Sequence, residues 1–155
     1  MNKKMLIDAI GLLLMALIVV VGYKLSPLLL PKADVTATPD PACDLHRKPC
    51  SAELPGGGRV ELSLVPRPIP MVKPLRLEVA VQGRRVSAAE VDFAGVSMNM
   101  GLNRPRLIAG EEGHFSGQAT LPVCVTGTMD WQATVLLETE RERIAVPFRF
   151  GSQPR

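Results

Sequence analysis

Aromatic residues are scarce in this sequence: one tryptophan, one tyrosine and four phenylalanines make up 4% of its 155 residues. Its charge is not concentrated either, because 18 lysines and arginines stand against 15 acidic residues and are scattered along the chain. A nucleic-acid-binding surface needs a concentrated basic face, usually with aromatic side chains that stack on bases. The sequence therefore predicts no nucleic-acid partner.

Motifs of common catalytic sites are also missing. The chain has no Gly-x-Ser-x-Gly nucleophile motif, and only His46 and His114 are present as histidine bases. The glycine run at residues 56–58 lacks the Lys-Ser/Thr ending of a phosphate-binding loop, and no helical pattern follows it. We expect a protein that is not an enzyme.

What the chain does contain at its start is a long apolar segment. Residues 9–23, AIGLLLMALIVVVGY, follow Lys3-Lys4 and, extended back to residue 5, would form about 28 Å of helix, close to the thickness of a bilayer's hydrocarbon core. This pattern predicts a single-pass inner-membrane anchor at residues 1–24, with the N-terminus inside and Pro27 stopping the helix. A cleaved signal peptide is the alternative, and the first tolerable cleavage site for it is Val35-Thr36-Ala37.

Residues 25–58 are polar and rich in proline, which is typical of an extended stalk. This segment contains CDLHRKPC, in which Cys43 and Cys50 would close a disulfide worth about 2.5 kcal/mol on the chain-entropy model. Such a bond indicates an oxidising compartment, and hence a periplasmic or other extracytoplasmic location. A metal site made of Cys43, His46 and Cys50, or cysteines with no special role, are the alternatives.

Beyond residue 58 the hydrophobic period changes to two, as in half-buried strands. We expect strands at residues 60–64, 75–82, 91–100, 107–108, 115–121, 131–138 and 144–150. About seven short strands separated by turn signals are typical of an immunoglobulin-like antiparallel β-sandwich. The predicted fold is thus all-β, with a sandwich domain at residues 59–150 and a short tail at 151–155, preceded by one transmembrane helix.

The stretch at residues 91–131 concentrates soft ligands. Met98 and Met100 stand two residues apart, and His114, Cys124 and Met129 follow at spacings that strand reversals could bring back beside them. Thioether, thiolate and imidazole groups together suit Cu(I). The alternative is a core role, because residues 96, 98 and 100 alternate with polar residues as an apolar strand face does, and methionine commonly fills gaps in cores.

A membrane helix, a stalk and a small sandwich that carries SMNMG, then GHFSG, then a Gly-x-Met-x-Trp segment resembles the FixH/YtkA-like family. That family is related in architecture to periplasmic copper carriers of the CopC type. The resemblance covers roughly residues 60–150 and the anchor. Where a second methionine-rich element is expected, this chain has Leu121-Pro122-Val123-Cys124-Val125, in which Cys124 would act as a softer ligand.

Members of that family are linked to metal handling and to the maturation of respiratory oxidases. The resemblance therefore implies a non-enzymatic, membrane-anchored accessory domain that acts as an interaction module of a membrane complex, such as a respiratory oxidase. The alternative that it implies is a Cu(I)-handling protein that binds copper through Met98 and Met100, with Cys124, His114 or Met129 as further ligands.

Overall fold

The computed structural model of the protein describes residues 2–29, 33–123 and 128–152. The chain divides into two compact units, Met1–Lys32 and Ala33–Arg155. The first unit contains the helix α1, Lys3–Leu29. Within its residues 3–24, an 18-residue window has a mean hydropathy of 2.7, so that α1 is long and apolar enough to cross a membrane. The predicted apolar helix is therefore present. The helix continues past Pro27, which we expected to stop it. A proline inside a helix removes one backbone hydrogen bond, but the helix can continue beyond it.

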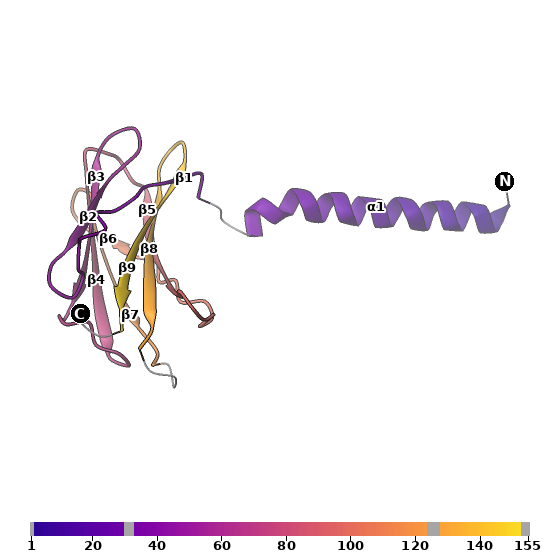
Figure 1. The fold of residues 1–155 in the computed structure, drawn as a ribbon. Coiled ribbons are helices and arrows are strands. Elements are labelled where there is room, and N and C mark those ends of the chain that lie inside the picture. Colours follow the sequence, from indigo (N-terminus) through magenta and orange to yellow (C-terminus); the bar gives the residue numbers. More distant parts are fainter. Residues whose placement is uncertain (1, 30–32, 124–127, 153–155) are drawn as a thin grey trace. The chain divides into compact units, whose positions relative to one another are not determined.

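The second unit is a β-sandwich of two sheets packed face to face (Figure 1). Its strands are β1 (Val35–Thr36), β2 (Cys50–Glu53), β3 (Arg59–Val65), β4 (Pro74–Gln82), β5 (Ala88–Gly95), β6 (Ile108–Ala109), β7 (His114–Thr120), β8 (Asp130–Glu138) and β9 (Arg143–Gly151). One sheet has the order β1-β9-β8-β5 and the other the order β2-β3-β4-β7-β6. Only β1 and β9 run parallel among the pairs of the described strands. This arrangement confirms the predicted all-β sandwich.

Strand alternation builds the core between the sheets as the sequence predicts. On β8 the buried residues are Trp131, Ala133, Val135 and Leu137, and the residues between them are partly exposed. The same alternation buries every second residue of β4 and most of β9. One face of each sheet packs against the core and the other faces solvent, so the period of two marks which side chains face the core.

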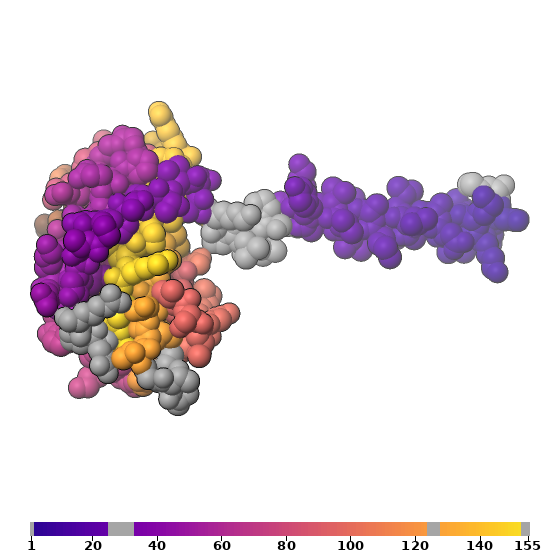
Figure 2. All heavy atoms as spheres, in the orientation of Figure 1, coloured from indigo at the N-terminus to yellow at the C-terminus, as the bar shows by residue number. Residues whose placement is uncertain are grey.

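Residues 33–58 belong to the sandwich, so the prediction of a stalk that reaches residue 58, and of a domain that begins at 59, is wrong. β1 and β2 are edge strands of the two sheets. The segment also contributes buried side chains to the core: Ala37, Leu45, Cys50, Ala52 and Leu54. In Figure 2 its violet atoms lie beside the yellow atoms of β9. The sequence pattern hides this role, because the apolar residues are separated by prolines and polar residues and form no long alternating run.

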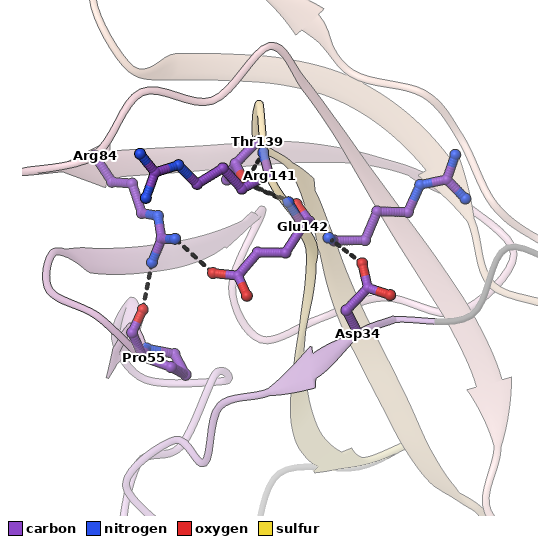
Figure 3. A network of polar contacts seen from close by, with 7 residues as sticks. Asp34, Pro55, Arg84, Thr139, Arg141 and Glu142 are labelled. Atoms are coloured by element: carbon purple, nitrogen blue, oxygen red, sulfur yellow. Dashed lines mark hydrogen bonds and ion pairs between the residues drawn. The ribbon is translucent and has the colours of Figure 1, made fainter.

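Polar contacts hold both ends of this segment against the body of the domain. The Asp34 N–H donates to the Arg143 carbonyl, and the Asp34 Oδ2 accepts from the Arg143 N–H, both at 2.9 Å. Arg84 donates to the Pro55 carbonyl and pairs with the Glu142 carboxylate at 2.5 Å, as Figure 3 shows. The segment is therefore fixed by hydrogen bonds as well as by its buried side chains.

Candidate functional site

Loops gather at one end of the sandwich, which we call the loop end: residues 66–73, 96–103, 121–123 and 128–129. They follow β3, β5 and β7 or precede β4 and β8. Hydrogen bonds join them, from the Val72 N–H to the Leu121 carbonyl (2.8 Å), from the Val96 N–H to the Asp130 carbonyl (2.9 Å), and from the Asn103 amide to the Thr120 carbonyl (3.0 Å). Sheet pairing agrees, because Pro74 pairs with Thr120 and Gly95 with Trp131. The loop end is thus one continuous surface.

The backbone of Met98 and the side chain of Met129 meet beside Gly95, the last residue of β5. A Cβ atom on Gly95 would lie 2.5 Å from the Met98 carbonyl oxygen and 3.1 Å from the Met129 Sδ. Residues 96–100 therefore fold back over the end of β5 against Met129. Met129 is buried, Met100 is half-buried and Met98 is 46% exposed. Three of the predicted metal ligands are thus brought to the loop end.

The expected core-facing strand at Val96, Met98 and Met100 is wrong. β5 ends at Gly95, and the Val96 and Met98 side chains are almost half exposed, although Met100 packs against the core. The change of phase at Gly95 marks the end of the strand. Apolar and polar residues go on alternating in the sequence for another five residues. The backbone of those residues bends and pairs with no strand, so the alternation there does not mark a strand.

His114 lies at the opposite end of the sandwich from the methionines. It is the first residue of β7 and pairs with Ala80, whereas Thr120 at the other end of β7 contacts the loop end. At about 3.3 Å per residue, the length of β7 separates His114 from the loop end by about 20 Å. His114 therefore shares no site with Met98, Met100 and Met129. Cys124 lies outside the described residues.

Cys43 and Cys50 form the predicted disulfide, with an S–S distance of 2.00 Å. Inside the loop that it closes, His46 is only 6% exposed and uses both ring nitrogens. Its Nδ1 accepts the Ile69 N–H at 3.1 Å, which leaves Nε2 to donate to the Gly151 carbonyl at 2.8 Å. The alternative of a metal site at Cys43, His46 and Cys50 is therefore wrong, because no thiolate or free imidazole nitrogen is left there.

Sequence reasoning missed the apolar residues that the loop end exposes. Outside α1, the exposed large apolar side chains of the described residues include Val72, Val96, Met98, Leu102 and Val123, all on the loop end. Leu102 is 84% exposed, and Val72 has a φ of 60°, an unusual value for a β-branched residue. The sequence signal for them was weak: single apolar residues beside glycines, prolines and asparagines.

A soluble domain seldom exposes several large apolar side chains together, and such patches mark interaction sites. Acidic and histidine ligands do not gather there, because within the described ranges no group of three or more His, Cys, Asp or Glu residues could hold a metal ion. A soft metal would depend on the methionines. The chemistry that the loop end offers is therefore apolar contact, and three methionines, Met98, Met100 and Met129, belong to the same end.

No protein-family model, curated protein or solved structure matches the chain. The resemblance to the FixH/YtkA-like family therefore stays a prediction.

Proposed function

We propose that this chain is a non-enzymatic, membrane-anchored accessory domain that acts outside the cytoplasm and docks a protein partner of a membrane complex through the loop end. The exposed apolar residues of the loop end carry this proposal. Val96, Met98 and Leu102 belong to one loop, and they would lose water contact only against another surface. The FixH/YtkA-like resemblance supports the same function.

The position of the first tolerable cleavage site supports a retained anchor over a removed signal peptide. Val35 and Thr36 form β1 and pair with Ile144 and Ala145 of β9. Ala37 is buried, and its N–H donates to the Ala145 carbonyl at 2.9 Å. Cleavage after residue 37 would remove an edge strand of the sandwich. The Cys43–Cys50 disulfide supports an oxidising compartment for the domain, beyond the inner membrane.

A photo-reactive side chain placed at Leu102 tests the docking function in native membranes. We expect one discrete adduct, and we expect Val96→Ser with Met98→Ser in the same chain to abolish it, since both changes remove apolar contact area. The matched control is the same photo-reactive group at Gln118, an exposed position of β7, which should give no adduct. Equal labelling from both positions would show that the loop end has no preferred partner.

Cu(I) handling is the second candidate function, and the placement of Met98, Met100 and Met129 at the loop end favours it. Thioethers are soft ligands and select Cu(I) over Zn(II). Met98, Met100 and Met129 would supply them, with the partner proposed to be a respiratory oxidase that receives the metal. His114 is excluded from this ligand set by its position at the other end of β7.

A competition titration against a Cu(I) chelator distinguishes copper handling from docking alone. Met98→Leu with Met100→Leu keeps apolar volume nearly constant and removes two thioethers. Copper handling predicts one bound Cu(I) in the wild type and a lost or much weaker site in the double variant, with the Leu102 adduct unchanged. Equal affinity in both proteins would leave docking as the function of the loop end.

A further inference from the structure

The edge of β9 next to β1 is open over a short stretch, and two prolines keep it open. The ladder between the two strands ends at Thr36 and Ala145. In a parallel ladder the next two bonds would run from the N–H of residue 147 to the carbonyl of residue 37, and from the N–H of residue 39 to the carbonyl of residue 147. Residues 39 and 147 are both prolines and have no N–H. The two strands therefore part at this point.

Backbone groups of β9 are left facing the gap. The carbonyls of Arg143 and Ala145 accept hydrogen bonds from the β1 side, and the carbonyl of Gly151 accepts one from His46. Alternate residues of β9 thus present their backbone to this edge, which places the Pro147 carbonyl and the Arg149 N–H and carbonyl there. Within residues 33–123 and 128–152, these three groups have no hydrogen-bond partner.

A groove of about 350 Å³ runs along this open edge. Residues 38–41 form one side of the groove and residues 147–149 form the other. Leu45 and the Cys43–Cys50 disulfide also line it. Leu45 and Phe148 are at most 2% exposed, so they form an apolar floor. The groove is large enough for one or two side chains and lies beside unpaired backbone donors and acceptors.

The outer edges of β5 and β7 are covered by other segments of the domain. Along β5, the Val91 N–H donates to the Pro105 carbonyl at 3.2 Å and the Phe93 N–H to the Asn103 carbonyl at 2.9 Å. Residues 108–109 pair with β7 in the same way. The open stretch of β9 therefore differs from these two edges, which the domain pairs with its own segments.

Two charged residues line the groove, Asp40 on the side of residues 38–41 and Arg149 on the side of β9, so the charge preference differs between the two sides. Arg149 is exposed, and its one side-chain hydrogen bond in the described structure is a long one of 3.4 Å to Gln132. No described carboxylate forms an ion pair with it. An acidic side chain next to the groove would complement this arginine.

We propose that this groove binds an extended segment of a partner protein by β-addition. The segment pairs its backbone with Pro147 and Arg149, inserts an apolar side chain over Leu45, and places an acidic side chain against the Arg149 guanidinium. The groove is lined by β9 and by residues 38–50, whereas the loop at residues 96–103 follows β5 at the other edge of the same sheet. A partner docked on that loop and a segment bound in the groove would therefore not exclude each other.

The test uses the full chain in detergent and two peptides with fluorescein at the N-terminus, Gly-Val-Glu-Val-Glu-Val-Gly-amide and the same peptide with lysine for glutamate. We expect saturable anisotropy for the glutamate peptide and about tenfold weaker binding of the lysine peptide, since tenfold corresponds to one charge-assisted contact. Arg149→Gln should remove the difference between the peptides. The control Arg76→Gln, an exposed arginine on β4, should leave it unchanged.

Closing the groove gives the sharper result. The double variant Pro39→Ala with Pro147→Val restores both backbone N–H donors, so that β1 and β9 can pair over a longer stretch. We expect its Tm to rise and its affinity for the glutamate peptide to fall at least about tenfold. Loss of binding with a raised Tm cannot come from unfolding. Absence of saturable binding to the wild type, or unchanged affinity in the closed variant, would overturn the proposal and leave the prolines as guards against edge-to-edge aggregation. Neither result bears on the adduct at Leu102, which tests the loop end.

Discussion

At the scale of single residues, His46 connects three parts of the chain that lie far apart in sequence. It joins the disulfide loop to Ile69 and to Gly151, and its ring lies 6.1 Å from that of Phe150 in an edge-on arrangement. Both ring nitrogens are needed, one as acceptor and one as donor. A histidine of this kind looks in sequence like a metal ligand or a base, because only the folded structure shows where its nitrogens point.

We predict that His46→Ala lowers the free energy of unfolding by about 1–3 kcal/mol, because it leaves the Ile69 N–H and the Gly151 carbonyl without their partner. Urea unfolding of the full chain in detergent measures this. His114→Ala is the matched control, since His114 is an exposed histidine of β7, and its effect should stay within about 0.5 kcal/mol. Equal effects of the two changes would contradict the structural role of His46.

Gly95 is a second residue whose role depends on its neighbours. We predict that Gly95→Ala is destabilising by about 1–3 kcal/mol and shifts the 96–100 loop, because the added methyl group would lie 2.5 Å from the Met98 carbonyl oxygen and 3.1 Å from the Met129 Sδ. Unfolding measurements together with methionine methyl NMR spectra check both effects. Gly57→Ala does not serve as a control because its φ is 102°, whereas Gly110→Ala, with more room, does. Methionine signals unchanged in Gly95→Ala would contradict the close approach.

At the scale of elements, the segment at residues 33–58 decides where the domain begins. We predict that residues 33–152 fold cooperatively without α1, and that residues 59–152 do not, because the shorter fragment lacks β1, β2 and the buried residues Leu45 and Leu54. Circular dichroism and thermal unfolding of the two fragments compare them. A cooperative transition of equal Tm in the shorter fragment would show that this segment only covers the sandwich from outside.

The elements also show where periodicity succeeds. The long strands β4, β8 and β9 each carry an alternating apolar face over nine residues, and the structure buries those faces. The strands that the sequence did not predict are β1, with two residues, and β2, with four, and both are too short to show a period. The pairing of β1 is also decided by a strand distant in sequence, because Val35 pairs with Ile144. The described residues therefore form nine strands, whereas the sequence predicted about seven.

At the scale of the whole molecule, the arrangement of anchor and disulfide leads to a topology prediction. In a Cys124→Ser chain, a membrane-impermeant maleimide should not label intact cells without reductant, because Cys43 and Cys50 are bonded to each other. After a reductant is added and the outer barrier is opened, both cysteines should react while the inner membrane is still sealed. Labelling that requires lysis of the inner membrane would place the domain in the cytoplasm. Labelling without reductant would contradict a stable disulfide.

The amino-acid sequence by itself determined the apolar helix, the all-β class, the long strands and the pairing of Cys43 with Cys50. Each of these depends on local spacing: a continuous apolar run, a period of two, or two cysteines seven positions apart. The tertiary structure alone decided that residues 33–58 enter the sandwich and that the Met98 backbone lies beside Met129 while His114 lies at the far end of β7. It also decided that Pro39 and Pro147 line the same groove at an open edge. Such contacts join residues that are distant in sequence. Strand pairing and side-chain packing bring them together, and local sequence patterns do not encode either, so sequence analysis cannot find these contacts.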